Sequence, residues 1–193
     1  MSKPILGVCG TFASGKDTVA EILERDHNVY HVSTSDIVRE KSMELYGNIE
    51  RETLHGVATQ FRQNQGGDYF VRESFKRYQA VEAQYSGVVI SGIRSLGEGR
   101  ALNELSGEMI FVDAPVEIRY ERMASRQRDD ESRKTLEEFL AFEKKERGGE
   151  TDDEWAFNID KLGAAAKYKI INDGTYDEFV AKVHELAKKV GLA

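Results

Sequence analysis

The fold is decided by the stretch Gly10-Thr11-Phe12-Ala13-Ser14-Gly15-Lys16. Its spacing, GxxxxGK, is that of a phosphate-binding loop, and it stands directly after an apolar run at residues 5–9 and before a helical pattern. The glycines permit backbone angles at which several N–H groups converge on one anion, and the helix N-terminus adds unsatisfied donors. We therefore expect these residues to bind the phosphates of ATP, with Lys16 reaching the β- and γ-phosphates during transfer.

One position departs from the usual pattern of such a loop. Asp17 stands where Ser or Thr normally offers a hydroxyl to Mg²⁺, and Thr18, which we also expect at the ATP site, is displaced by one residue. A carboxylate is a hard-oxygen ligand and is favoured in the first turn of a helix, so we expect Asp17 to hold the metal. Alternatively, Asp17 only caps the helix and Mg²⁺ is held by other groups.

Outward from this loop, strand and helix patterns alternate along the chain. Apolar runs predict buried strands at residues 5–9, 88–90 and 109–112, with weaker candidates at 29–32 and 168–171. Four groups of apolar residues have the spacing of one face of a helix. They are Val19, Ile22 and Leu23; Leu54, Val57, Ala58 and Phe61; Val71, Phe75, Tyr78 and Tyr85; and Phe179, Val183, Leu186 and Val190. Residues 135–162 are helical in pattern, with a break at Gly148-Gly149. The alternation predicts an α/β fold with a doubly wound, five-stranded parallel sheet flanked by helices, in a single domain over residues 1–193.

Composition restricts the classes of function. The only cysteine among the 193 residues is Cys9, which excludes an internal disulfide and a cysteine-cluster metal site. The formal net charge of -7 argues against binding a nucleic acid polymer, and no apolar run is long enough to span a membrane. The first residues carry too short an apolar stretch for a signal peptide, so we expect a cytoplasmic enzyme, either a monomer or a small homo-oligomer. The scattered histidines are interpreted as surface or packing residues.

The nucleotide-monophosphate site of adenylate kinases resembles the segment Val32-Ser33-Thr34-Ser35-Asp36-Ile37-Val38-Arg39. That family has Ser-Thr-Gly-Asp, two apolar residues and Arg, so Ser35 replaces the glycine here. The resemblance implies that Thr34 and Arg39 hold the acceptor and its phosphate. Dephospho-coenzyme A kinases carry an acidic residue at the same place, which implies that Asp36 is the base for an accepting hydroxyl. A simpler interpretation is that Ser33, Ser35 or Asp36 caps the next helix.

A second similarity follows the third predicted strand. Ser91-Gly92-Ile93-Arg94 is similar to the Asp-Gly-x-Arg stretch of these kinases, which implies that Arg94 binds the acceptor's phosphate, where a guanidinium can act bidentately. Ser91 departs from the relatives, which usually place a metal-orienting Asp there. Asp17 or Asp36 would then orient the metal instead.

The second half of the chain is similar to dephospho-coenzyme A kinases. Their passage from strand to lid resembles Phe111-Val112-Asp113-Ala114-Pro115 followed by Glu117, Arg119, Arg122 and Arg126. This implies that Arg122 and Arg126 are catalytic, that Arg122 also binds ATP, and that Arg128 binds substrate. The implied lid covers residues 126–134, and the implied acceptor-binding helical region covers about residues 34–86. Asn172 and Gly174 lie in a stretch that resembles the loop touching the ATP base.

As a whole the chain most resembles an uncharacterised P-loop kinase-like group that is best represented in archaea. The resemblance implies a phosphotransferase that uses ATP and Mg²⁺ on a phosphorylated small molecule, with a nucleoside monophosphate favoured by the string at residues 32–39. The lid and tail favour dephospho-coenzyme A and its 3′-hydroxyl instead. A nucleotide-binding switch or slow ATPase stays open, although Arg39 and Arg94 favour a kinase because a switch needs no second phosphate site.

Overall fold

Five strands form one parallel sheet in the computed structural model, which describes residues 2–125, 135–148 and 153–192. They are β1 (Ile5–Gly10), β2 (Val29–Ser33), β3 (Gly87–Ser91), β4 (Glu108–Asp113) and β5 (Tyr168–Ile171). Their order is β2-β3-β1-β4-β5, and every pairing is parallel. The predicted sheet is confirmed, including both of its weaker strands.

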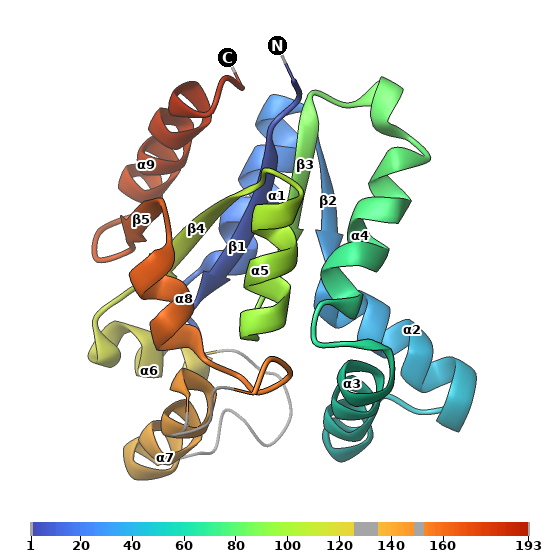
Figure 1. Cartoon of the computed structure of the whole chain (residues 1–193). Coiled ribbons are helices and arrows are strands. Elements are labelled where there is room, and N and C mark those ends of the chain that lie inside the picture. The colour runs from blue at the N-terminus through green and yellow to red at the C-terminus, as the bar shows by residue number, and fades with distance from the viewer. Residues whose placement is uncertain (1, 126–134, 149–152, 193) are drawn as a thin grey trace.

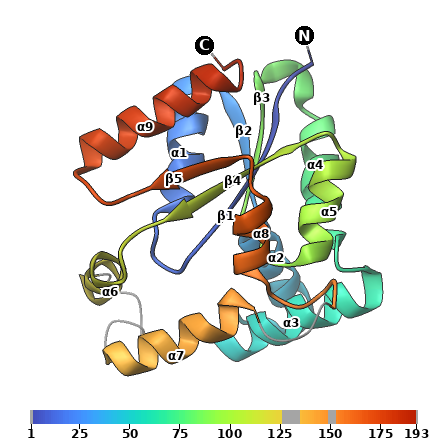
Figure 2. The same ribbon diagram turned by 60° about the vertical axis from the view of Figure 1, so that its left-hand side comes forward.

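Helices cover both faces of the sheet, as Figures 1 and 2 show. They are α1 (Lys16–His27), α2 (Thr34–Tyr46), α3 (Arg51–Gln65), α4 (Tyr69–Gln79), α5 (Leu96–Glu104), α6 (Val116–Ser125), α7 (Leu136–Arg147), α8 (Ile159–Ala165) and α9 (Tyr176–Lys189), with a short 3-10 turn, η1 (Glu82–Gln84). None of the helices in the described residues has the length and apolar character needed to cross a bilayer.

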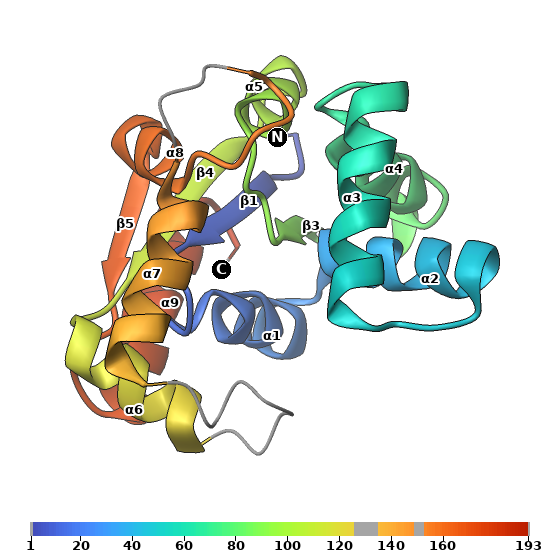
Figure 3. The ribbon, with the colours of Figure 1, turned by 90° about the horizontal axis from the view of Figure 1, so that it is seen from below.

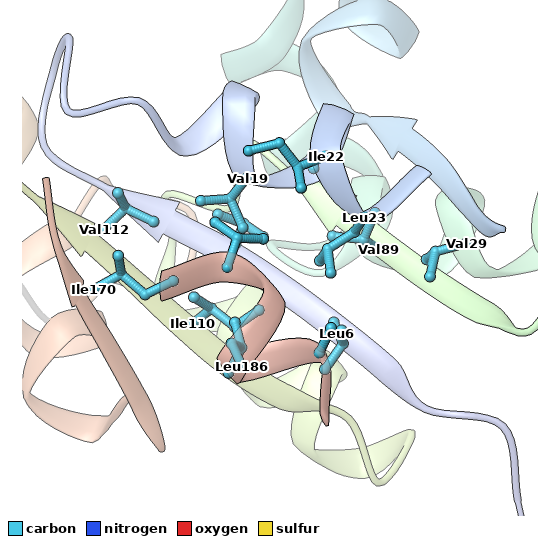
Figure 4. Packing of buried hydrophobic residues seen from close by; sticks show 14 of the residues in the cluster. Leu6, Val19, Ile22, Leu23, Val29, Val89, Ile110, Val112, Ile170 and Leu186 are labelled. Carbon is cyan, nitrogen blue, oxygen red and sulfur yellow. The ribbon is translucent and has the colours of Figure 1, made fainter. Parts of the chain in front are cut away.

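The largest core cluster lies between the sheet and the pair α1 and α9 (Figure 4). Leu6 and Val8 of β1 project into it, whereas Cys9 belongs to the cluster on the opposite face, under α4, α5 and α8. This alternation is what a strand buried on both faces requires. Each fully buried aliphatic side chain contributes about 1.5–3 kcal/mol, so β1 is held firmly where the phosphate loop begins.

A third cluster holds α2, α3 and α4 together beyond the ends of β2 and β3. It is built from Val32, Ile37, Val38, Val57, Ala58 and Phe70. Within the helical region predicted for about residues 34–86, the structure has α2, α3 and α4, and the helices end at Gln79 apart from the short turn η1. Tyr85 is an exception to the predicted helical spacing, because α4 ends at Gln79 and Tyr85 leads into β3, with its ring 5.0 Å from that of Tyr30.

The break predicted after α7 is also present. Gly148 ends the helix with a φ of 126°, and the next described helix, α8, begins only at Ile159. Residues 153–158 form an irregular connection that crosses toward α5, where Asn158 N donates to Arg94 O at 2.8 Å. This connection therefore reaches the carboxyl edge of the sheet.

That edge is where a ligand site is expected. After β1 the chain crosses to β2, one edge strand of the sheet, and after β4 it crosses to β5, the other edge strand. Because β1 and β4 are neighbours in the sheet, the two connections diverge between them, and open α/β sheets bind ligands at such a point. Figure 3 looks onto this edge, with α2 and α3 on one side, α6 and α7 on the other, and the start of α1 between them.

Candidate functional site

The phosphate loop connects β1 to α1 in a conformation that requires its last glycine. Gly15 is the N-cap of α1 with a φ of 98°, and a Cβ there would lie 2.5 Å from Asn172 Nδ2. At the start of the loop, Thr11 N donates to Val112 O at 3.2 Å, which ties the loop to β4. The loop therefore presents the N-terminus of a twelve-residue helix, which is a favourable place for an anion.

Side chains from three other segments brace this loop. Thr11 Oγ1 donates to Asp113 Oδ1 at 2.6 Å, and Asn172 Nδ2 donates to Ser14 O at 2.9 Å. Arg119 of α6 is only 3 % exposed; its Nη1 donates to Phe12 O at 3.3 Å and lies 2.8 Å from Glu143 of α7. Arg119 thus supports the loop from beneath, although the sequence places it in one series with Arg122.

A smaller cavity of about 210 Å³ opens beside the loop, on the α6 and α9 side. Its described lining is Gly15, Thr18, Arg122, Asn172, Tyr176 and Phe179. Arg122 Nη2 donates to Asn172 Oδ1 at 3.0 Å, so these two predicted residues meet. Gly174 lies next to Thr175, the N-cap of α9, and outside this described lining.

A larger cavity of about 350 Å³ lies on the other side of the loop. Its described lining is Phe12, Thr34, Ser35, Val38, Arg39, Arg51, Leu54, His55, Ala58, Arg62, Gly92, Arg94, Phe142, Lys145, Glu146 and Phe157. Thr34, Arg39 and Arg94, which the sequence predicts as substrate ligands, come together here. Thr34 Oγ1 donates to Gly92 O at 2.9 Å, which fixes the start of α2 against the β3–α5 loop.

Asp36 takes a different place from its predicted companions. Its side chain is 64 % exposed, accepts a hydrogen bond from Arg39 Nη1 at 2.6 Å, and does not belong to the described lining of the larger cavity. The carboxylate therefore faces Arg39 at the rim.

The larger cavity also collects residues that the sequence analysis missed. Arg51, Leu54, His55, Ala58 and Arg62 share one face of α3, a spacing that could have signalled them. Another wall of the cavity is formed by Phe142 and Lys145 of α7 and by Phe157 of the connection after it. Nothing in the sequence around these three residues indicated that they would line a site. Arg51 lies over the ring of Phe142 at 4.5 Å, and Arg94 pairs with Glu146.

The residues at the start of α1 fit a bound nucleotide and Mg²⁺. Asp17 is exposed in the first turn of the helix, next to Lys16. Ser91 Oγ lies 2.9 Å from His31 Nε2, so that hydroxyl already has a partner. In the described part of the chain no three His, Cys, Asp or Glu residues gather to hold a metal. A carboxylate acting together with nucleotide phosphates is the donor set that suits Mg²⁺ here.

The predicted lid at residues 126–134, with Arg126 and Arg128, lies outside the described residues.

Comparison with known proteins supports the assignment of the fold. A family model described as "AAA domain" matches residues 6–147. The UPF0200 protein of Thermococcus onnurineus is 30 % identical over 190 residues, covering 96 % of this chain and 97 % of the relative. The UPF0200/UPF0201 protein of Archaeoglobus fulgidus is 25 % identical over 189 residues and covers 96 % of this chain, but the chain spans only 55 % of that longer relative.

Solved structures of kinases share the architecture. A shikimate kinase from Bacteroides thetaiotaomicron matches with a TM-score of 0.60 and 15 % identity over 96 % of this chain and 97 % of that one. A dephospho-CoA kinase from Campylobacter jejuni matches with a TM-score of 0.53 and 17 % identity over 96 % of each chain. At these identities the likeness shows the fold alone.

Proposed function

This chain belongs to the AAA domain family and to the UPF0200 proteins, and we propose that it is an ATP-dependent phosphotransferase whose acceptor is a nucleoside monophosphate. Its P-loop kinase-like fold, and the archaeal relatives that match the resemblance seen in the sequence, are the premise. The activity and the acceptor are what we add to it.

One observation carries the proposal: two cavities flank a single phosphate loop. Gly15 lines the smaller cavity and Phe12, three residues earlier, lines the larger one. A transferase needs a site for the donor and a site for the acceptor, with the transferring group between them. A nucleotide-binding switch needs only the first site, so the larger cavity favours a transferase.

The smaller cavity suits the nucleoside part of ATP. Arg122 and Asn172 line it together, and its wall includes Gly15, where the helix dipole and the loop N–H groups favour the phosphates. Lys16 would bind the β- and γ-phosphates and follow their charge during transfer. Asp17 would hold Mg²⁺, which when bound neutralises charge on the phosphates.

The larger cavity suits a phosphorylated acceptor. Arg39, Arg51, Arg94 and Lys145 line it, and the acidic residue in the described lining, Glu146, pairs with Arg94. Guanidinium groups bind phosphate bidentately, and the cavity size is that of a small-molecule site.

The position of Asp36 supports a phosphate acceptor over a hydroxyl acceptor. In transfer to a phosphate, a deprotonated oxygen of the acceptor bonds to the γ-phosphorus, and the bond to the β–γ bridging oxygen breaks. The electron pair leaves with ADP and no proton is removed. Asp36 sits outside the described lining and is engaged by Arg39, which supports a reaction that needs no base.

A coupled assay of ADP release tests the proposal. The arms are the common ribonucleoside and deoxyribonucleoside monophosphates, dephospho-coenzyme A, shikimate, and no acceptor, each with wild type and Lys16→Ala. We expect at least one monophosphate to raise ADP release well above the no-acceptor rate in wild type alone. Turnover with dephospho-coenzyme A or shikimate and with no monophosphate would refute the acceptor assignment. ADP release that no acceptor stimulates would refute the transferase.

A further inference from the structure

The floor of the larger cavity contains a buried arginine, Arg62, that the phosphate-binding scheme above does not use. Arg62 lies on α3 and its side chain is only 4 % exposed, yet it lines the cavity. A guanidinium group carries five N–H donors and no acceptor. A buried arginine at the bottom of an open cavity is therefore either fully paired with protein or available to a ligand.

Glu98 pairs with Arg62 and fixes its position. Arg62 Nε and Nη2 donate to the same oxygen, Glu98 Oε1, at 3.0 and 2.8 Å. The other oxygen accepts from the backbone N–H groups of Arg94 and Ser95, at 2.7 and 3.1 Å, as part of the capping box of α5. With a fully buried side chain and both oxygens engaged, Glu98 is held in place, and it holds Arg62.

Two aromatic rings set the plane of the guanidinium group. The Arg62 Cζ atom lies 5.0 Å from the ring centre of Phe70 and 5.2 Å from that of Phe157. Among the described residues, every hydrogen bond that the side chain of Arg62 donates goes to Glu98, so the two Nη1 N–H groups keep their capacity to donate. The bonds to Glu98 and the two rings hold the guanidinium group in one orientation at the cavity wall.

Arg94 places a second positively charged side chain in the same cavity. Its Cζ lies 5.5 Å from the ring centre of Phe157, and its Nη1 donates to Glu146. The acidic residue of the described lining, Glu146, is thereby engaged, and Arg62 and Arg94 place N–H donors beside the ring of Phe157. The ligand group that suits such a floor is planar and carries acceptor atoms on its edge.

We propose that Arg62 reads the base of the acceptor nucleotide and selects a keto base, meaning hypoxanthine, guanine or uracil, over the amino bases adenine and cytosine. This inference rests on the proposed function and names its substrate class more narrowly. A donor-only guanidinium edge pairs with the O6 and N7 atoms of a 6-keto purine or with O4 of a 4-keto pyrimidine. In adenine and cytosine an amino group, itself a donor, replaces that oxygen.

Matched nucleotides test the proposal, because IMP and AMP, like UMP and CMP, differ chiefly in the keto or amino group at one position. We would measure kcat/KM for each acceptor at fixed ATP, and the affinity of each for the protein without ATP by calorimetry. We expect the keto member of each pair to be favoured about tenfold or more, since a well-placed arginine contact distinguishes bases by roughly tenfold to a hundredfold.

The variant must remove the donor edge without leaving a buried charge. Removing Arg62 alone would strand Glu98, so the test uses Arg62→Gln together with Glu98→Gln, which keeps Gln at the capping position of α5. A second variant, Arg62→Lys, keeps the charge and loses the planar fork. We expect the IMP-to-AMP ratio to fall to about one or below in the double variant, because Gln can accept from an amino group, and to fall only in part in Arg62→Lys, which keeps donors but loses the fork, with the KM for ATP unchanged in both. Thermal unfolding checks that each variant folds.

Lys145→Gln is the matched control, since Lys145 is a cation in the same lining but lies on α7. It should weaken IMP and AMP equally and leave their ratio as in wild type. A wild-type ratio of one or less, or a ratio that the double variant leaves unchanged, would overturn base reading by Arg62 while leaving the kinase in place. If no monophosphate binds or is phosphorylated, the proposed function fails, and this inference falls with it.

Discussion

The ring of Phe12, in the phosphate loop, packs edge-on against the ring of Phe142 in α7, with centroids 5.3 Å apart and planes at 73°. Both rings line the larger cavity. The wall of the proposed acceptor site is therefore built partly on the loop proposed to hold ATP. Because Arg119 also joins Phe12 O to Glu143 of α7, a movement of α7 acts on the loop through two contacts.

A double-mutant cycle measures this contact. We expect Phe12→Leu and Phe142→Leu each to destabilise the protein, and to be non-additive by about 0.5–1.5 kcal/mol, the usual strength of an aromatic pair. Denaturant unfolding of the four proteins gives the coupling, and KM for the acceptor should rise in both single variants. Leu140→Ala, at a 44 % exposed position of the same helix, is the control and should change stability by less than about 0.5 kcal/mol. Additive effects would mean that the rings are adjacent without being coupled.

Lys16→Ala tests the phosphate loop. We expect transfer to fall by at least about 10² to 10³-fold, because a preorganised cation beside the transferring phosphate is lost. Alanine is favourable in a first helical turn, so the melting temperature should stay within a few degrees of wild type. Lys188→Ala, at an exposed position near the end of α9, should leave both quantities unchanged. Wild-type turnover in Lys16→Ala would remove the assignment of the loop.

The fold could be predicted because its signals are local. The apolar runs of β1, β3 and β4 and the loop at residues 10–16 can each be recognised from a few consecutive residues. Strands buried on both faces are typical of a parallel sheet covered by helices, so these runs also predicted the arrangement of the helices. The resemblance at residues 32–39 grouped Thr34 and Arg39, and both line the larger cavity.

The rest of the candidate site depends on contacts between distant segments. Arg62 is held at the cavity by Glu98, which is 36 residues away in the sequence. Phe142 and Phe157 line the same cavity although they lie far from Arg62 in the sequence. Arg119 and Arg122 lie three residues apart on α6, yet Glu143 draws one beneath the loop while Asn172 engages the other. Helical spacing alone could not separate their roles.

Arg122→Ala should act mainly on ATP binding. Arg122 lines the smaller cavity and donates to Asn172 Oδ1, whose amide in turn donates to Ser14 O of the loop. Losing a charge-assisted contact of this kind should raise the KM for ATP roughly tenfold or more, with a smaller change in kcat. Steady-state kinetics in ATP and in acceptor separate the two. A large fall in kcat at unchanged KM would instead assign Arg122 to the transition state.

Cys9 should be chemically inert in the native protein. Burial raises the pKa of its thiol from the ordinary value of 9.0 to about 12. We expect no reaction with a disulfide reagent at pH 8 until guanidinium unfolds the chain, because the thiolate is the reactive form. Since the folded pKa is the higher one, this contribution to stability is complete below pH 9 and declines as the pH rises toward 12. The loss above pH 9 should therefore be smaller in Cys9→Ala than in wild type, and rapid native labelling would contradict the burial.

Asp36→Asn decides between the two kinds of acceptor. Asp36 is largely exposed and engaged by Arg39, and exposed ion pairs are worth little, so with a monophosphate acceptor the variant should lose only a few-fold in kcat/KM. Its pH profile between pH 6 and 9 should follow that of wild type, because the acceptor phosphate is already deprotonated and no base is removed. Arg39→Gln serves as the comparison and should raise the acceptor KM, since Arg39 lines the cavity and Asp36 does not belong to its described lining. A loss of about 10² to 10⁴-fold in Asp36→Asn, together with a changed pH profile, is what removal of a general base produces. That result would move the acceptor from a phosphate to a hydroxyl while leaving the phosphate loop and both cavities with the roles proposed for them.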